Sequence, residues 1–186
     1  KDGLVPSTEW KKKTYGQPWF EGETVSVSIG QGAVWLTPAQ LVQLASFVAN
    51  EGINYKPHIV NRIVSPEGKV IKTFEPVINT NVKLKKDTIR LVKEGMKGVV
   101  NEGSGTAYGS RLENVSMSGK TGTAQSVGEK GRNLGDHAWF IAYAPSDNPS
   151  VAISVLVEYG GHGSSAAAPV AKMVTDRMFN EKKEIK

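Results

Sequence analysis

The residues whose types and spacing could do chemistry are Lys120, Thr121 and Gly122, within the stretch SGKTGTAQ at positions 118–125. This Lys-Thr-Gly triplet suits two kinds of site. Preceded by a glycine, it can end a nucleotide-binding loop that holds a phosphate. On a strand, it can hold a carboxylate beside a serine nucleophile that transfers acyl groups. The surrounding sequence decides between these two kinds of chemistry.

The phosphate site is disfavoured by the residues on both sides of the triplet. Counting back from Gly119, the first glycine of such a loop would be at position 114, which is Asn114. A phosphate-binding loop must also run directly into a helix whose N-terminus faces the phosphate. Residues 126–135 (SVGEKGRNLG) are rich in glycine and do not favour a helix. The sequence therefore argues against a nucleotide site.

The triplet and Thr123 fit the acyl-transfer site residue by residue. The ammonium of Lys120 would attract a substrate carboxylate and help proton movement near a nucleophile. A unit charge pair about 4 Å apart, at an effective dielectric of ~20, is worth roughly 4 kcal/mol before desolvation. The hydroxyl of Thr121 would bind the same carboxylate, and Gly122 has no side chain to keep an acyl-donor peptide off the strand. The backbone of Thr123 could pair with that peptide, and its N–H could supply half of an oxyanion hole.

Three strands are expected around and after the triplet, at residues 116–125, 137–144 and 151–159. The last two are almost continuously apolar, which is typical of strands that are covered on both faces. The connection between them, PSDNPS, is short, so they must be antiparallel neighbours. A hairpin is expected at residues 56–74, where two strand-like runs flank Pro66-Glu67-Gly68.

Three helices are expected to pack on these strands. The first is capped by Thr37 and stopped by Gly52, the second is capped by Asp87 and stopped by Gly103, and the third covers residues 164–179. Apolar residues recur at helical spacing in the first two helices: Leu41, Leu44, Ala45 and Val48 in the first, and Ile89, Val92, Met96 and Val99 in the second. The stripe of the first helix is wide, and we expect it in the core.

The ends of the chain are expected to be less regular. Residues 1–35 are rich in Gly, Pro and Trp, and we expect irregular structure there with a short strand at 24–29. The polar tail at 180–186 is expected to fray. The resulting fold class is α+β, an antiparallel β-sheet flanked by α-helices.

Composition excludes several other functions. The chain has 186 residues, 39% of them hydrophobic and 22% charged, which predicts a single globular domain. It has no cysteine and only three histidines without ligand spacing, so a disulfide or a structural zinc site is not expected. The net charge of +5 comes largely from short lysine runs without interleaved aromatic residues, which indicates a solvated surface and no nucleic-acid binding. No apolar run reaches the ~18 residues of a membrane span, and no signal peptide opens the chain.

Several longer stretches, taken in order, resemble the elongation-type class B penicillin-binding proteins, the PBP2 group of D,D-transpeptidases. They begin with PSTEWKKKTYGQPWFEGETVSVSIGQG and LTPAQLVQLASFVANEG and continue with GSGTA, SGKTGTAQ, HAWFIAYAP and VAISVLVEYGGHG. The resemblance covers nearly the whole chain and implies the penicillin-binding protein or serine β-lactamase-like transpeptidase fold. It implies catalytic roles for Lys120, Thr121 and Gly122, and a role for Thr123 in binding the substrate or a β-lactam and in the oxyanion hole.

The resemblance also implies an activity and partners. Such an enzyme cross-links peptidoglycan stem peptides in cell-wall elongation, through a serine acyl-enzyme formed at the penultimate D-alanine, and β-lactam antibiotics acylate it. It implies a location on the periplasmic side of the bacterial inner membrane, with an anchor outside this chain and with membrane proteins of cell-wall elongation as partners. No cofactor and no metal are implied.

The sequence departs from this family in one respect. Its Ser-x-x-Lys nucleophile motif is missing, because no serine has a lysine three positions later. We therefore expect residues 1–186 to be the C-terminal portion of the transpeptidase domain, with the nucleophile before Lys1, and we expect this chain alone to be inactive. Ser146-Asp147-Asn148 spells the family's Ser-x-Asn motif, but it follows the triplet, and its residue types are those of a turn.

Two rival functions share the triplet: a serine β-lactamase, which needs a deacylating base, and a non-catalytic β-lactam sensor of the same fold. Slow hydrolysis of the acyl-enzyme would distinguish a penicillin-binding protein from a lactamase. Other polar residues near the expected strand ends, His137, Glu158 and His162, are expected to have structural or solvated roles. The stretch GSGTAYG at residues 103–109 fits a mobile loop and a structural scaffold equally well.

Overall fold

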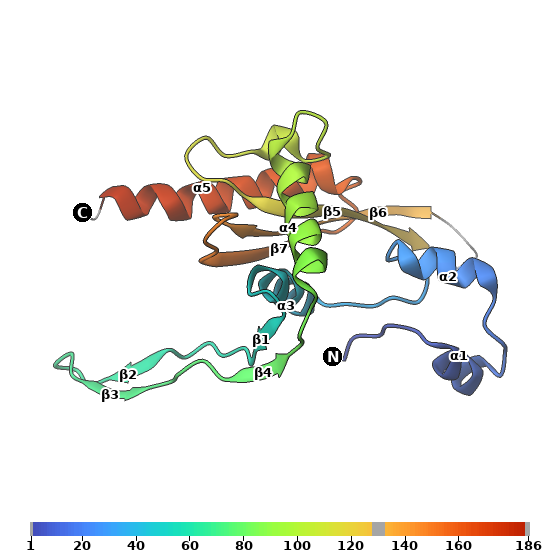
Figure 1. Ribbon diagram of the computed structural model, residues 1–186, viewed down its shortest axis with the longest axis horizontal. Helices are drawn as coiled ribbons and strands as arrows, with labels where there is room; N and C mark the ends of the chain where they lie inside the picture. The colour runs from blue at the N-terminus through green and yellow to red at the C-terminus, as the bar shows by residue number, and fades with distance from the viewer. Residues whose placement is uncertain (1, 128–132, 185–186) are drawn as a thin grey trace.

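The architecture is centred on a three-stranded antiparallel sheet. The computed structural model of the protein describes residues 2–127 and 133–184 (Figure 1). The sheet contains β5 (Ser118–Val127), β6 (Asn133–Ala144) and β7 (Val151–Val157) in the order β5-β6-β7. The three predicted strands and their antiparallel arrangement are confirmed, and β5 lies at one border of the sheet. Part of the predicted non-helical stretch 126–135, residues 128–132, lies outside the described residues.

Helices lie on both faces of this sheet, which confirms the α+β prediction. In Figure 1, α5 (Ala168–Glu184) runs along one face and α3 (Pro38–Ala49) lies on the other, where it packs on β7 and β6. The helix α4 (Lys86–Asn101) crosses the sheet and packs on β5. As a result, β6 is the most enclosed strand, and the two border strands are less covered.

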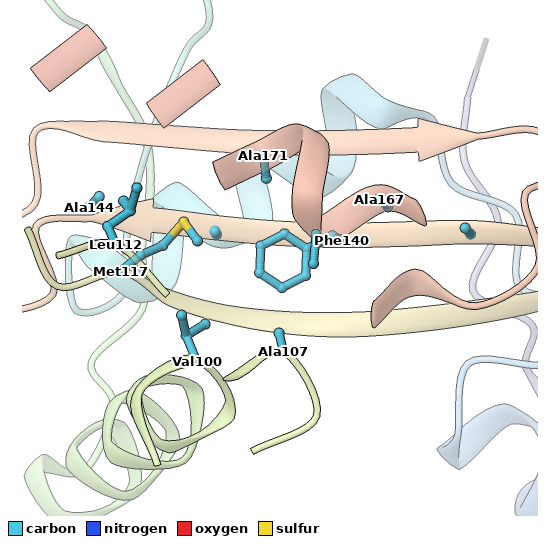
Figure 2. Close-up of a cluster of buried hydrophobic side chains, with 11 residues drawn as sticks. Val100, Ala107, Leu112, Met117, Phe140, Ala144, Ala167 and Ala171 are labelled. Atoms are coloured by element: carbon cyan, nitrogen blue, oxygen red, sulfur yellow. The ribbon is translucent and has the colours of Figure 1, made fainter. Parts of the chain in front are cut away.

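The hydrophobic core lies between the sheet, α5 and the end of α4. The ring of Phe140, on β6, has no exposed surface and lies at the centre of this cluster (Figure 2). Ala167 and Ala171 approach it from the side of α5, while Val100 and Ala107 come from α4 and the loop after it. Burying one such aromatic side chain contributes about 1.5–3 kcal/mol relative to leaving it exposed. The core therefore fixes the position of β5 relative to both helices.

The first predicted helix, α3, begins where its cap predicts. The Thr37 Oγ1 accepts from the Gln40 N–H at 3.2 Å, and the Thr37 N–H donates to the Gln40 Oε1 at 2.8 Å, a reciprocal cap. The expectation that its whole apolar stripe lies in the core is wrong, because Ala45 is fully buried but Leu44 is 46% exposed. The physical reason is that the sheet covers α3 on one side only.

The prediction for the first 35 residues is wrong. They contain two helices, α1 (Thr8–Tyr15) and α2 (Glu21–Ser28), and the strand expected at 24–29 is helical. The start of α1 is capped by the Ser7 Oγ, which accepts from the Trp10 N–H at 3.1 Å. The start of α2 is stabilised by Glu23, whose carboxylate accepts from the Phe20 N–H at 2.8 Å and also from the buried Lys11 ammonium of α1. These contacts override the alternating pattern of TVSVSI.

The predicted hairpin is confirmed as part of an arm that extends from the body of the protein (Figure 1). The strands β2 (Arg62–Val64) and β3 (Val70–Thr73) pair through a turn in which the Gly68 N–H donates to the Ser65 carbonyl at 2.9 Å. Nearer the body, β1 (Ile53–Tyr55) pairs with β4 (Ile78–Asn81). The arm leads into α4.

Two helix boundaries differ from the predictions. Asp87 does not cap α4, because the helix already begins at Lys86 and Asp87 lies within its first turn. There Asp87 approaches Arg90, with a distance of 3.6 Å between the two charged groups. The last helix begins with a π-helical turn, η3 (Gly163–Ala167), and α5 continues to Glu184, so most of the polar tail is helical where fraying was expected. Among the described residues, no helix combines the length and the apolar character required to cross a bilayer.

Candidate active site

The Lys-Thr-Gly triplet lies on the border strand β5. In the antiparallel register, Lys120 is opposite Ile141, Thr121 is opposite Phe140 and Gly122 is opposite Trp139, all on β6. The strand continues beyond the triplet to Val127, so no helix begins there. This arrangement excludes the phosphate-binding loop, which requires a helix N-terminus after the threonine. The triplet instead presents an exposed lysine at a sheet border, as the acyl-transfer hypothesis requires.

Two side-chain hydrogen bonds identify the backbone groups that point away from the sheet. The Lys120 Nζ donates to the Thr121 carbonyl at 2.7 Å, and the Gln31 Nε2 donates to the Thr123 carbonyl at 2.9 Å. In a β-strand, the N–H and the carbonyl of one residue point to the same side, and this side alternates along the strand. The N–H groups of Thr121 and Thr123 therefore also point outward. The outer border thus combines backbone donors with one ammonium group.

The hydroxyl of Thr121 has a partner that sequence reasoning missed. The Oγ1 atoms of Thr106 and Thr121 are 3.1 Å apart, close enough for either hydroxyl to donate to the other. Thr106 belongs to the GSGTA stretch, whose sequence fits a mobile loop and a structural scaffold equally well. The next residue, Ala107, is buried, and its N–H donates to the Val99 carbonyl at 2.9 Å. These contacts favour the scaffold interpretation of this stretch.

Gly122 is packed more closely than the sequence suggests. A Cβ atom at Gly122 would lie 3.1 Å from the Trp139 Cβ, and a Cβ atom at Gly163 would lie 2.5 Å from the Gly122 carbonyl oxygen. The backbone at the start of η3 therefore rests directly on the triplet. The absence of a side chain at Gly122 serves packing within the fold, in addition to the expected approach of a donor peptide.

Ser146, the first residue of the Ser-x-Asn sequence, is buried against β5 and does not lie at its exposed border. The Ser118 Oγ donates to the Ser146 Oγ at 2.8 Å, and both side chains are buried. Asp147 forms an ion pair with Lys97 at 2.9 Å. The predicted turn at Ser146-Asp147-Asn148 is confirmed. Its polar groups hold the connection between β6 and β7 in place.

Among the other polar candidates, His137 has a hydrogen-bond partner away from the triplet. His137, on β6, accepts a hydrogen bond at its Nδ1 from the Tyr159 N–H at 3.0 Å, and the two rings pack together. This contact supports the structural role expected for His137. Within residues 2–127 and 133–184, no cluster of three His, Cys, Asp or Glu side chains could hold a metal ion.

A border strand with an exposed Lys-Thr-Gly triplet, on an antiparallel sheet between helices, matches the class of serine acyl-transferases that bind penicillin, in which this triplet is one of three signature motifs. Comparison with known families agrees. Residues 4–176 match the penicillin-binding protein transpeptidase domain. The chain therefore belongs to the penicillin-binding protein transpeptidase family.

Individual relatives place the chain within this family. It is 38% identical over 192 residues to the peptidoglycan D,D-transpeptidase MrdA of Haemophilus influenzae, covering 96% of this chain and 29% of that protein. It is similar to Pseudomonas aeruginosa PBP2, with a TM-score of 0.78 and 38% identity, covering 96% of this chain and 38% of that one. It is also similar to Helicobacter pylori PBP2 in a complex with MreC, with a TM-score of 0.73 and 30% identity, covering 96% of this chain and 31% of that one. The chain thus spans less than a third of the curated relative's length.

Proposed function

We propose that the protein is a peptidoglycan D,D-transpeptidase of cell-wall elongation, to which these residues contribute one wall of the active site. The observation that carries the proposal is the exposed Lys-Thr-Gly triplet on the border of the sheet, in a chain of the penicillin-binding family. A border strand whose outward backbone groups are not paired with another described strand is suited to pairing with an extended peptide. A stem peptide that ends in D-alanine, or a β-lactam that resembles it, is the substrate class that this wall would receive.

The residues of β5 would divide the work as follows. Lys120 and the hydroxyl of Thr121 would bind the carboxylate at the end of the donor peptide. The outward N–H of Thr123 would donate to the carbonyl oxygen of the penultimate D-alanine as it gains negative charge. A serine oxygen would attack that carbonyl carbon, and the bond to the terminal D-alanine would break as its nitrogen gains a proton. The amine of a second stem peptide would then attack the resulting ester, release the serine and form the cross-link.

We further propose that residues 1–186 form the C-terminal portion of the transpeptidase domain. Two observations support this division: no serine is followed by lysine at the third position, and the curated relative is more than three times as long as the stretch it shares with this chain. Apolar side chains before α3 are also exposed to an unusual degree. The exposed fractions are 66% for Val25, 73% for Ile29 and 63% for Trp35. Exposed apolar groups of this size are typical of surfaces that another part of a protein covers.

Location and partners follow from the same proposal. Peptidoglycan lies outside the inner membrane, so the enzyme would work on its periplasmic side. The similar Helicobacter pylori protein is seen in a complex with MreC, which supports membrane-associated elongation proteins as partners of the whole protein. Stem peptides would be its substrates, and β-lactam antibiotics its covalent inhibitors.

A labelling experiment on the full-length protein tests this function. Incubation with a fluorescent penicillin should give a covalent adduct on one serine, and the adduct should persist because a transpeptidase hydrolyses it slowly. Purified lipid-linked peptidoglycan precursors, polymerised and then mixed with the protein, should yield cross-linked stem peptides. Rapid release of the label would instead indicate a β-lactamase, and labelling without any cross-linking would indicate a sensor.

A further inference from the structure

The loop Gly30-Gln31-Gly32 presents a single side chain to the border of β5. Gly30 and Gly32 have φ angles of +77° and +73°, in the left-handed region that favours glycine. Between them, the Gln31 N–H donates to the Ser26 carbonyl at 2.9 Å, so the loop folds back onto the end of α2. The backbone of Gln31 is therefore held in a defined turn rather than in a free connection.

From this turn, the side chain of Gln31 reaches a strand that is 92 residues away in sequence. Its Nε2 donates to the Thr123 carbonyl at 2.9 Å, in a partly buried contact. This carbonyl is on the outer side of β5, where no described strand pairs with it. The Gln31 amide thus supplies the hydrogen bond that a neighbouring strand would otherwise supply.

We infer that Gln31 is a positioning residue for acyl transfer, which acts by holding the Thr123 backbone at the angle that the oxyanion donor requires. The inference rests on the proposed function. The N–H and the carbonyl of Thr123 flank the same Cα atom and point to the same side, so fixing the carbonyl restricts the rotation of the N–H. An oxyanion donor acts only within about 2.7–3.1 Å of the developing charge. A small rotation of the Gly122–Thr123 peptide group, which carries this N–H, would therefore weaken the donor.

The contact leaves room for a substrate. A backbone carbonyl has two lone pairs, so the Thr123 oxygen can accept from Gln31 and also from an N–H of the donor peptide. Gln31 therefore does not need to leave when the donor binds. Its effect is expected on the rate of acylation at saturating substrate rather than on the first binding step.

The test compares two substitutions in the full-length protein. Gln31→Met keeps the length of the side chain and removes the donor, and Gln17→Met makes the same change at an exposed glutamine between α1 and α2. For each protein, stopped-flow measurements with penicillin give the acylation rate constant and the dissociation constant of the initial complex separately. Infrared spectroscopy of the acylated protein gives the stretching frequency of the ester carbonyl, which falls as its oxyanion hydrogen bonds strengthen.

We expect Gln31→Met to lower the acylation rate constant by about 10-fold, less than the roughly 10²–10³-fold lost when an oxyanion donor is removed, because the donor stays in place and only its direction is less well fixed. The ester carbonyl should shift to a higher frequency, the dissociation constant should change little, and Gln17→Met should match the unmodified protein. Both readouts come from the reactive fraction only, so partial misfolding does not alter them. Unchanged acylation and an unchanged carbonyl band in Gln31→Met would overturn the inference alone. Failure of the unmodified protein to react at all would remove the proposed function and the inference with it.

Discussion

At the scale of single residues, side chains supply hydrogen bonds to the outward carbonyls at the border of β5. The carbonyls of Thr121 and Thr123 accept from the side chains of Lys120 and Gln31, where a further strand would otherwise pair. The hydroxyl of Thr121 is oriented by Thr106. A peptide that pairs with this border therefore meets groups whose directions are already set, which reduces the cost of organising them during the reaction.

The charge of Lys120 gives the first prediction. In the full-length protein, Lys120→Ala should lower the second-order rate constant of penicillin acylation by roughly 10²-fold, because loss of one preorganised electrostatic partner costs on the order of 3 kcal/mol. Lys12→Ala, on the exposed face of α1, is the matched control and should leave acylation unchanged. Both variants should unfold at nearly the same temperature as the unmodified protein. Acylation of Lys120→Ala at the normal rate would contradict the role assigned to this ammonium.

Part of this chemistry can be read from the sequence, and part cannot. Lys120, Thr121, Gly122 and Thr123 belong to one short motif, so their residue types and spacing are enough to propose a site. Gln31 contributes through a contact across 92 residues, and no local pattern relates it to Thr123. Such a contact depends on how α2 and β5 pack, which spacing within one motif does not specify.

At the scale of elements, the triplet is held between β6 and the start of η3. A Cβ atom at Gly163 would lie only 2.2 Å from the Trp139 carbonyl oxygen. Gly163→Ala should therefore push η3 away from β5 and destabilise the domain by about 1–3 kcal/mol, the usual cost of overpacking. Thermal unfolding of the full-length protein measures this loss. Gly95→Ala in α4, where a Cβ atom would meet open space, should be neutral or slightly stabilising.

The contact between α1 and α2 predicts a dependence on pH. The hydrogen bond from Lys11, together with that from the Phe20 N–H, holds the pKa of Glu23 below its ordinary value of 4.5. Because the folded-state pKa is lowered, the contribution of Glu23 to stability is present above pH 4.5 and is lost as the pH falls through the folded-state pKa.

Glu23→Gln should accordingly lower the unfolding temperature at pH 7, and its difference from the unmodified protein should shrink as the pH falls below 4.5. Glu21→Gln, in the same first turn of α2, lacks the contact with Lys11 and serves as the control. Calorimetry at several values between about pH 3 and pH 7 measures this difference, because carboxyl groups titrate within roughly this range. A difference that stays constant over this range would show that the charge of Glu23 does not stabilise the pair.

The helices also show which local sequence patterns predict a helix start correctly. The Thr37 cap predicted the start of α3 correctly, because Thr37 and Gln40 satisfy each other within a single turn. Ser7 offers only half of such a cap, since the residue three positions later is Trp10, and it lies in a region rich in glycine and proline that does not predict a helix. The residues of α2 alternate as a strand would, and the contacts of Glu23 with the Phe20 N–H and with Lys11 favour the helix instead.

At the scale of the whole molecule, the three-stranded sheet with α3 and α5 on opposite faces matches the expected α+β architecture. The meander was predictable because two apolar strands with a short connection can pair only as antiparallel neighbours. The position of β5 at the border followed from the acyl-transfer hypothesis rather than from any pattern of its own. The exposure of Leu44 was not predictable, since the sequence of α3 does not tell which part of the stripe the sheet covers.

The division of the active site gives a prediction at this scale. The 186-residue chain, expressed alone, should form no covalent adduct with a fluorescent penicillin, because it contains no serine with a lysine three positions later. The full-length protein under the same conditions should be labelled. Mass spectrometry of the intact chain and of its peptides is the measurement. A stoichiometric adduct on any serine of residues 1–186 would show that the nucleophile lies within this chain.

The central claim is that β5 binds the reacting group, and a crystal structure of the full-length protein acylated by penicillin tests it most directly. We predict the penicillin carboxylate at the Lys120 ammonium and the Thr121 hydroxyl, and the ester carbonyl oxygen about 2.7–3.1 Å from the Thr123 nitrogen. A penicillin adduct that lies away from β5, with no contact to Lys120, Thr121 or Thr123, would contradict the account.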